Sequence, residues 1–295
     1  MHLRYAKELK SNIRMSGILM KLCKLSSSTS QANQFRIVGG FDTDISDAPY
    51  MASLRELRKE IRALGSGHFC GGTIIKDRVI LTAAHCLTKR SPAKALVVVG
   101  FKYLSLNWPT MKKLKISNWN YHKKYRKERK AIFDIGLIFT IENIEPVNGA
   151  IAFLPLNTVE ISPGTKCLLS GWGRVEHNAP HRASCLQSLW QRILDKRVCF
   201  KIANRYDLLC TNSGLPTGAS RGDSGGPLRC NDKLAGVIAA GDLHGLALYT
   251  DVRPFADWIE EQIRNGIMPL GSFCIGKHVV LAISICVATI CKSGF

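Results

Sequence analysis

Residues 222–227 of this 295-residue chain read GDSGGP, and this stretch decides the fold. Ser224 stands between an aspartate and two glycines. Three glycines in six residues indicate a tight backbone path that side chains would block. Such a path can aim backbone N–H groups at one point beside the Ser224 hydroxyl, which is the geometry of an oxyanion hole next to a nucleophile. The simpler alternative is a polar surface turn, which most clusters of Gly, Asp and Ser form.

A serine nucleophile needs a base, and the base needs an orienting carboxylate. Residues 81–86 (LTAAHC) place His85 after a short apolar run, and residues 134–138 (DIGLI) place Asp134 before another. Alone, each has an ordinary explanation: a structural histidine, and a strand with a polar start. Together with Ser224 they follow the chain order of the chymotrypsin-type catalytic triad. The three residues therefore predict acyl-transfer chemistry.

On these residues the chain resembles the chymotrypsin-like serine proteases, which share the trypsin fold. Further stretches that match the family are IVGG at 37–40, CGGT at 70–73, GWG at 171–173, YT at 249–250 and WI at 258–259. The matches cover residues 37–266. The resemblance thus implies a leader and pro-segment over 1–36, a protease domain over 37–266 and a separate tail over 267–295.

The resemblance implies a serine endopeptidase and assigns roles at its site. Ser224 would attack the peptide carbonyl, His85 would take and return its proton, and Asp134 would orient His85. The N–H groups of Gly222 and Ser224 would bind the oxyanion. Protein or peptide substrates and protein protease inhibitors are the partners that follow.

Arg36 and Ile37 form the junction at which the resemblance implies activation. Cleavage after Arg36 would free the Ile37 amino group, which would pair with Asp223 in the interior. A buried carboxylate without a partner is unfavourable, so the uncut chain would be a zymogen with an unformed oxyanion hole. The alternative, an ordinary strand after an exposed arginine, explains neither Gly39-Gly40 nor Asp223.

Short β-rich runs alternate with turn residues through residues 37–266. The pattern predicts strands at 73–75, 79–82, 96–99, 135–139, 166–169 and 234–238. A helical period occurs only at 254–263, where four apolar residues share a face. The sequence predicts an all-β protein with one C-terminal helix. The resemblance specifies two six-stranded antiparallel β-barrels, with His85 and Asp134 from the first and Ser224 from the second.

The resemblance also locates the primary specificity pocket, whose floor is the residue six before the nucleophile. Trypsin-like members carry an aspartate there, whereas this chain has Gly218. The pocket residues implied are Gly218, Ala219, Arg221, Ala240, Gly241 and Ala247. An uncharged slot accepts large apolar side chains and disfavours an unpaired Lys or Arg. The protein would therefore not cut after Arg36 itself, and an activating trypsin-like protease is expected.

One departure from the family supports a different function. Ala239 and Ala240 replace the usual serine and aromatic residue of the strand that pairs with substrate. Ala239 lacks a hydroxyl that supports the catalytic acid, and Ala240 opens the apolar wall of the cleft. The alternative is thus a weakly active or inactive protease homologue that acts as a binding protein.

Eleven cysteines favour an oxidising compartment, so the protein is expected to be secreted or stored in a secretory granule. The resemblance implies the disulfides Cys70–Cys86, Cys167–Cys230 and Cys199–Cys210. One family bridge is missing because Ser220 takes a cysteine position, as in chymases and granzymes. Five cysteines stay unassigned, and a Cys23–Cys185 tether of the pro-segment is one option for two of them.

Neither a metal nor a cofactor is expected. No C-x-x-C spacing occurs, which removes the usual zinc pattern. The stretch 101–127, where relatives often bind calcium, contains no Asp or Glu to supply the oxygen ligands that calcium needs.

The formal net charge of +19 favours polyanionic partners such as heparin-like glycans. No RNA- or DNA-binding motif accompanies the charge, so nucleic acid is not expected. Two basic segments, 55–62 (RELRKEIR) and 122–130 (HKKYRKERK), are read either as solvated loops or as an exosite.

The C-terminal tail offers a third alternative, a membrane-anchored protease. Residues 279–291 form an apolar run of 13 residues, which is shorter than the ~20 that a spanning helix needs. Small residues at 271–272 followed by an apolar tail resemble a lipid-anchor signal. An extra surface tail explains the run equally well.

Overall fold

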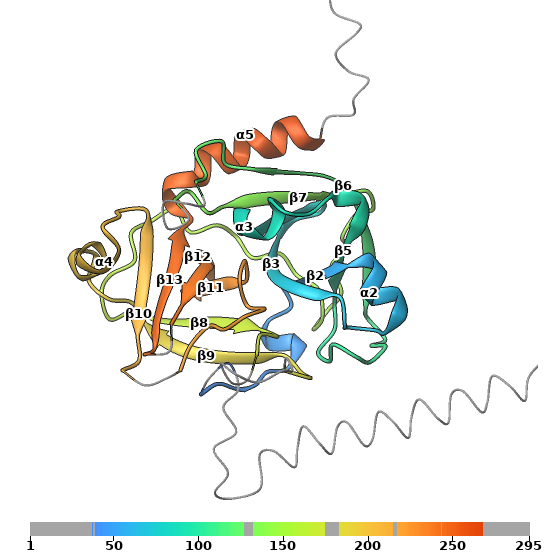
Figure 1. The fold of residues 1–295 in the computed structure, drawn as a ribbon, viewed down its shortest axis with the longest axis horizontal. Helices are drawn as coiled ribbons and strands as arrows, with labels where there is room; N and C mark the ends of the chain where they lie inside the picture. The colour runs from blue at the N-terminus through green and yellow to red at the C-terminus, as the bar shows by residue number, and fades with distance from the viewer. Residues whose placement is uncertain are drawn as a thin grey trace, which may run out of the picture.

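The computed structural model describes residues 37, 39–126, 132–174, 183–214, 217–242 and 244–267. Two β-sheets lie side by side, and the C-terminal helix α5 (Ala256–Ile267) packs across β7 of the first sheet (Figure 1). The prediction of an all-β protein with a C-terminal helix is confirmed. The predicted leader and nearly all of the tail lie outside the described residues.

The first sheet is a closed barrel of six antiparallel strands. In barrel order the strands are β2 (Met51–Glu56), β3 (His68–Lys76), β4 (Val79–Thr82), β7 (Gly136–Thr140), β6 (Lys112–Tyr121) and β5 (Ala95–Val99). β4, β5 and β7 are buried along their whole length, and they read as continuous apolar runs for that reason. β6 instead alternates, with Leu114 and Ile116 buried and Lys113 and Lys115 exposed, because one of its faces meets solvent.

The second sheet has seven strands and differs slightly from the expected barrel of six. Its order is β1 (Phe41–Asp42), β9 (Gln187–Arg192), β8 (Lys166–Gly171), β11 (Pro227–Cys230), β12 (Lys233–Gly241), β13 (Leu246–Asp251) and β10 (Leu208–Asn212). The short strand β1 adds to the edge at β9. At the opposite edge, Thr211 of β10 forms an isolated bridge with Ile193, the residue after β9, and the described residues show no ladder between the two strands. The second sheet is therefore a curved, incompletely closed barrel, because no continuous hydrogen-bonded ladder joins its two edges in the described residues.

Helical segments are more numerous than the sequence predicted. Besides α5 the structure contains α2 (Leu57–Arg62), α3 (Ala84–Leu87), α4 (Lys196–Ala203) and the 3-10 turns η1 (Ile45–Asp47), η2 (Pro92–Lys94) and η3 (Arg253–Phe255). α4 begins at Asp195, whose carboxylate accepts a hydrogen bond from the Arg197 amide at 2.8 Å, and ends at Asn204 in the left-handed region. These segments were missed because eight residues or fewer are too few to show a helical period.

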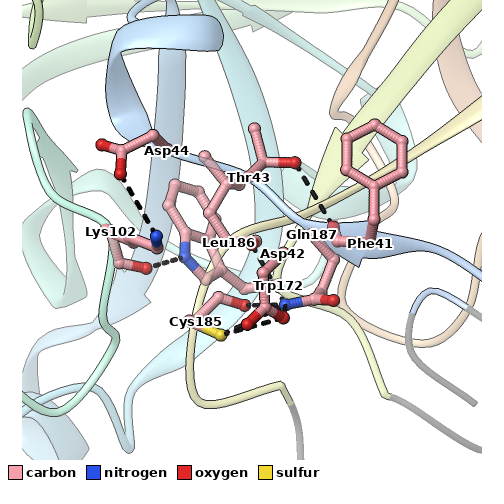
Figure 2. Close-up of polar contacts among 9 residues, drawn as sticks. All are labelled: Phe41, Asp42, Thr43, Asp44, Lys102, Trp172, Cys185, Leu186 and Gln187. Carbon is pink, nitrogen blue, oxygen red and sulfur yellow. Dashed lines mark hydrogen bonds and ion pairs between the residues drawn. The ribbon is translucent and has the colours of Figure 1, made fainter. Parts of the chain in front are cut away.

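The segment after the predicted activation junction joins the two sheets (Figure 2). Gln187 of β9 donates from Nε2 to Asp42 Oδ1 at 2.9 Å, and Asp44 Oδ2 lies 3.3 Å from Nζ of Lys102, which follows β5 of the first barrel. Trp172, which follows β8, donates from Nε1 to the carbonyl oxygen of Lys102 at 2.9 Å and stacks on Phe101 with ring centroids 4.6 Å apart. Trp172 is fully buried, so one large aromatic side chain of the second sheet is packed against the first barrel.

We expect the closed barrel to carry much of the stability of the protein. Ile138 of β7 is fully buried, so Ile138→Ala should lower the free energy of unfolding by about 2–5 kcal/mol through lost burial and a cavity. Urea denaturation measures the change. Ile141→Ala is the matched control, because Ile141 is 54% exposed and its truncation should cost less than about 0.5 kcal/mol. Equal losses in the two variants would contradict the assignment of the core.

Candidate active site

His85 and Asp134 meet on the first barrel. His85 lies in α3, directly after β4, and Asp134 lies shortly before β7, the neighbour of β4 in the barrel. Asp134 Oδ2 is 2.6 Å from His85 Nδ1, and Asp134 Oδ1 accepts the His85 backbone N–H at 2.8 Å. The carboxylate is fully buried while the imidazole is 30% exposed. The pair thus fixes the ring and leaves Nε2 as the nitrogen that can face a reacting group.

The second sheet holds the backbone of the same aspartate. Thr250 of β13 donates from Oγ1 to the carbonyl oxygen of Asp134 at 3.0 Å. Within the described residues, the Asp134 carboxylate accepts hydrogen bonds from His85 alone. Ala239 has no hydroxyl that could donate a third hydrogen bond to this carboxylate, as the sequence predicted. The second sheet therefore holds Asp134 through the backbone carbonyl of Asp134 and not through its carboxylate.

The Ser224 loop is bound to both sheets. The Gly71 amide of β3 donates to the carbonyl oxygen of Ser224 at 2.8 Å, and the Gly225 amide donates to that of Ile238 in β12 at 2.8 Å. Gly225 has φ 81°, and a Cβ there would lie 2.6 Å from Gly71 O. The glycines of the two motifs therefore allow a close approach of two backbones, which is why the loop needs them.

Two amides beside Ser224 are not used by the fold. The amides of Asp223, Gly225 and Gly226 all donate to carbonyl oxygens of the chain. Among the described residues, no hydrogen bond uses the N–H groups of Gly222 or Ser224. Both are available to a ligand oxygen beside the Ser224 side chain.

His85 and Ser224 flank one sulfur atom of the Cys70–Cys86 disulfide. Cys86 Sγ lies 3.8 Å from His85 Nε2 and 3.7 Å from the carbonyl oxygen of Ser224. No hydrogen bond joins Ser224 Oγ to His85 Nε2 in the part of the chain that the structure describes. Such bonds are often long before a substrate binds.

Asp223 is a fully buried carboxylate held by backbone amides. Oδ1 accepts from Gly173 N at 2.7 Å and Oδ2 accepts from Ser220 N at 2.9 Å. A Cβ on Gly171 or Gly173 would overlap the carboxylate, so the GWG motif makes room for it. No ion pair with Asp223 is formed by the described residues, and burial raises its pKa from 3.8 to about 6.

Ile37 is fully buried in the core of the second sheet together with Ala219. The side chain thus already occupies the interior in the uncut chain. Arg36, the other half of the predicted junction, lies outside the described residues.

A cavity of about 260 Å³ opens beside Ser224. Four of the six predicted pocket residues contribute to its wall, together with three others, and the lining is Ala219, Ser220, Arg221, Ser224, Ile238, Ala240 and Gly241. Gly218 and Ala247 are buried but do not line it. Gly218 has φ 148°, where side chains are strained, and a Cβ there would face open space.

The structure contains the three disulfides Cys70–Cys86, Cys167–Cys230 and Cys199–Cys210. Where the family bridge is missing, the Ser220 hydroxyl donates to the carbonyl oxygen of Arg174 at 2.5 Å. Cys70, His85 and Cys86 lie close enough to suggest a metal cluster, but both cysteines are disulfide-bonded and have no thiolate to ligate one. Cys23, one half of the possible Cys23–Cys185 tether, lies outside the described residues.

The two basic segments differ in the structure. Lys123, Lys124 and Arg126 are exposed, and residues 127–130 lie outside the described part. In the first segment, by contrast, Arg55 is fully buried and paired with Glu60. The interpretation of residues 55–62 as a fully solvated charged loop is therefore wrong for Arg55 and Glu60. These two side chains are buried and pair with each other.

Sequence reasoning missed one contact to the oxyanion loop. His68 Nε2 lies 3.1 Å from the carbonyl oxygen of Gly222, and His68 Nδ1 lies 2.8 Å from Ser53 Oγ. His68 precedes the CGGT motif by two residues, but no spacing in the sequence marks it as a partner of a loop more than 150 residues away.

The two-sheet fold and the His85–Asp134 pair beside the Ser224 loop define a chymotrypsin-like, trypsin-fold protein. The trypsin family profile matches residues 37–259, and the chain belongs to that family. Hypodermin-B of Hypoderma lineatum is 31% identical, with 78% of this chain and 88% of that protein aligned. Duodenase-1 of Bos taurus is 29% identical over 84% of this chain and 96% of its own.

Solved structures agree with this family. Human heparin binding protein superposes with a TM-score of 0.68 at 25% identity, covering 77% of this chain and 97% of its own. Serine protease 57 of Mus musculus, a further relative, is 31% identical over 79% of this chain and 83% of its own. The protein is a serine endopeptidase by family.

The raised pKa of Asp223 has a consequence for the uncut chain. The folded chain holds this proton more tightly than the unfolded chain, so the contribution to stability is present below pH 4 and is lost as the pH rises through about 6. We expect Asp223→Asn, which cannot ionise, to gain about 3 kcal/mol relative to wild type between pH 4 and pH 7.5. Urea unfolding of the intact chain at both pH values measures this difference.

The control for that experiment is Asp77→Asn, an exposed aspartate changed in the same way. Its stability relative to wild type should not change with pH by a comparable amount. A pH-independent difference between Asp223→Asn and wild type would show that the Asp223 carboxylate has a cation partner in the uncut chain.

Proposed function

We propose that this protein is made as a zymogen, is cleaved after Arg36, and hydrolyses peptide bonds with Ser224, His85 and Asp134. The observation that carries the proposal is the pair of unused amides, those of Gly222 and Ser224, in a loop close to a partly exposed histidine that is paired with a buried aspartate. A simple surface turn would not require the close approach of two backbones that is seen between Gly71 and Gly225.

In the proposed mechanism, Ser224 Oγ attacks the substrate carbonyl while His85 Nε2 takes its proton. Asp134 accepts the hydrogen of His85 Nδ1, which keeps Nε2 free as the base and stabilises the imidazolium that forms. The carbonyl oxygen becomes an oxyanion between the Gly222 and Ser224 amides. His85 then protonates the leaving amine, and water attacks the acyl-enzyme by the same route.

Activation is proposed to supply the cation that Asp223 lacks. Cleavage after Arg36 creates an ammonium at Ile37, whose side chain is already in the interior near Ala219. A buried carboxylate paired with this ammonium no longer carries an uncompensated charge. Because Asp223 is the residue between the two oxyanion amides, its pairing would stabilise their orientation.

We propose a preference for large apolar side chains before the cleaved bond. Gly218 presents no side chain, and its φ of 148° disfavours any other residue, so no charge lies at that position. Ala219, Ile238 and Ala240 supply apolar walls to the cavity beside Ser224. Arg221 is exposed at the same cavity, where it would repel a substrate Lys or Arg.

A second candidate function is a binding protein with weak activity and a polyanionic partner. It is favoured by the alanines at 239 and 240 and by the similarity to human heparin binding protein, whose name describes what that protein binds. Here the exposed residues Lys123, Lys124 and Arg126 provide the charge.

The proposed location is a secretory granule or the extracellular space, where disulfides persist. Membrane anchoring through the tail is the alternative. Among the described residues, no helix is long and apolar enough to cross a bilayer. Protein protease inhibitors present in the same compartment would bind the cleaved form.

The triad is tested by substitution in protein cleaved after Arg36. Ser224→Ala should abolish labelling by a fluorophosphonate, and Asp134→Asn should lower kcat about 10⁴-fold, as the same change does in the chymotrypsin-type triad. Ser162→Ala, at an exposed serine, is the control and should label as wild type. Undiminished peptidase activity in Ser224→Ala would remove Ser224 as the nucleophile.

Activation is tested by incubating the pure zymogen alone and with a trace of trypsin, followed by N-terminal sequencing. The wild type alone should stay intact, because a pocket without an acidic residue leaves the Arg36 charge unpaired. Trypsin should expose Ile37 and give activity on substrates with Phe, Tyr, Leu or Met before the cleaved bond. Spontaneous release of Ile37 by wild type but not by Ser224→Ala would show that the pocket accepts arginine.

Polyanion binding is tested on immobilised heparin. Replacing Lys123, Lys124 and Arg126 by alanine should lower the salt concentration needed for elution, because fewer sulfates are neutralised. The matched control replaces three exposed lysines elsewhere, Lys76, Lys201 and Lys233. Equal shifts in the two triple variants would mean that net charge rather than a site is responsible.

A further inference from the structure

The turn that carries Asp134 begins with a residue in an unusual backbone conformation. Phe133 has φ 55°, in the left-handed region that residues with a Cβ disfavour. The Ile135 amide donates to the Phe133 carbonyl oxygen at 2.8 Å, so Asp134 is the central residue of a three-residue turn. The His122 amide donates to the Ile135 carbonyl oxygen at 3.1 Å and holds the end of this turn. The direction in which the Asp134 side chain leaves the backbone therefore depends on the conformation of Phe133.

The residue type of Phe133 does not account for its conformation. Among the described non-glycine residues, positive φ values also occur at Ile37, Asn204, Asn231 and Asp232. Three of these four are asparagine or aspartate, whose short polar side chains tolerate the left-handed region because they can form local hydrogen bonds. Phenylalanine has no polar group for this purpose. The surrounding structure must therefore impose the conformation on Phe133.

The ring of Phe133 is held by two other rings. It stacks on His122 with centroids 4.8 Å apart, and it meets the Phe255 ring in a T-shaped arrangement at 5.9 Å. Phe255 is buried and ends η3, directly before α5, and Trp258 of α5 contacts the other partner, His122, at 5.2 Å. Both arrangements are favourable for aromatic pairs. The ring contacts thus offset the unfavourable backbone conformation of Phe133.

Few other contacts fix the orientation of Asp134. Its carboxylate accepts hydrogen bonds from His85 alone within the described residues, and Ala239 has no hydroxyl to add another. Thr250 holds the Asp134 carbonyl oxygen and leaves the side chain free to turn. A change in the backbone at Phe133 would therefore move the carboxylate away from His85 Nδ1, which now lies 2.6 Å from it.

We propose that Phe133 is a positioning residue for Asp134. Its ring contacts with His122 and Phe255 hold the left-handed backbone conformation that directs the Asp134 carboxylate to His85. The proposal rests on the catalytic role proposed for Asp134. It also gives the C-terminal segment a part in the site, since Phe255 lies directly before α5.

The kinetic test uses three variants of the protein cleaved after Arg36, namely Phe133→Ala, Phe133→Gly and Phe133→Asn. All three remove the ring, but glycine and asparagine tolerate φ 55° whereas alanine does not. We expect kcat on a peptide substrate to fall about 10-fold in Phe133→Ala, because most molecules then leave the left-handed conformation. Phe133→Gly and Phe133→Asn should stay within about threefold of wild type, and KM should change less than twofold in every variant.

Phe133→Leu replaces Phe133→Ala if the alanine variant does not fold, as urea unfolding shows. Leucine keeps apolar volume at this position but disfavours the left-handed region as alanine does. The matched control is Phe200→Ala. Phe200 is also partly buried and stacks on a ring, that of Tyr206 at 4.2 Å, but it lies in α4 with a helical backbone. This control should match wild type in kcat.

The direct readout is the ¹H resonance of the His85 Nδ1 proton. A proton in a short charge-assisted hydrogen bond is deshielded, so the 2.6 Å contact with Asp134 should give a strongly downfield signal in wild type. Phe133→Gly, Phe133→Asn and Phe200→Ala should keep this signal. Phe133→Ala should lose it or shift it upfield, which a loss of packing without movement of Asp134 would not do.

Failure of this proposal and failure of the proposed function give different results. If cleaved wild type neither hydrolyses peptides nor reacts with a fluorophosphonate, the proposed function is wrong, and the His85 resonance still decides the role of Phe133. Loss of the signal in Phe133→Ala but not in Phe133→Gly then supports the proposal. A signal that is unchanged in Phe133→Ala, or absent from wild type, overturns it. If wild type is active, equal losses of kcat in the three Phe133 variants, or wild-type kcat in Phe133→Ala, overturn it as well.

Discussion

The rest of the structure depends on Asp223, a buried carboxyl group to which no described residue supplies a cation. Its oxygens accept amide hydrogens from Gly173, which follows β8, and from Ser220, which lines the cavity beside Ser224. Gly171 and Gly173 must lack side chains to admit it. Ser224, the two unused amides and the cavity are therefore all positioned relative to one buried carboxyl group, whose free energy depends on whether it is paired.

Both sheets contribute to every part of the site. The first barrel supplies His85 and Asp134, but a threonine of the second sheet holds the Asp134 backbone. The second sheet supplies Ser224, but Gly71 of the first barrel binds its carbonyl oxygen. The hydrogen bonds that cross between the sheets thus set the distance between His85 and Ser224, and Trp172 packed against Phe101 holds the sheets together nearby.

Buried polar groups on the first barrel extend this arrangement beyond the three proposed catalytic residues. Arg55 and Glu60 occur in a segment of alternating charges that looks like a solvated loop. In the fold they pair in the interior at the start of a chain of hydrogen bonds to Gly222. Charge in this protein is therefore of two kinds: exposed lysines that can meet a polyanion, and internal groups that orient one another.

The sequence by itself determined the fold class, the family and the identity of the proposed catalytic residues. Apolar runs such as 79–82 and 96–99 predict buried strands, and glycine-rich motifs mark places where backbones must approach closely, because both signals arise from local chain properties. Only the tertiary fold brings His68 against the Gly222 carbonyl, with Ser53 and Arg55 linked behind it by hydrogen bonds. The fold also makes α2 and α4 helices and leaves Gly218 and Ala247 outside the cavity wall. The reason is that these features depend on groups far apart in the chain, or on segments too short for a period, so their positions follow from packing rather than from any pattern in the residues themselves.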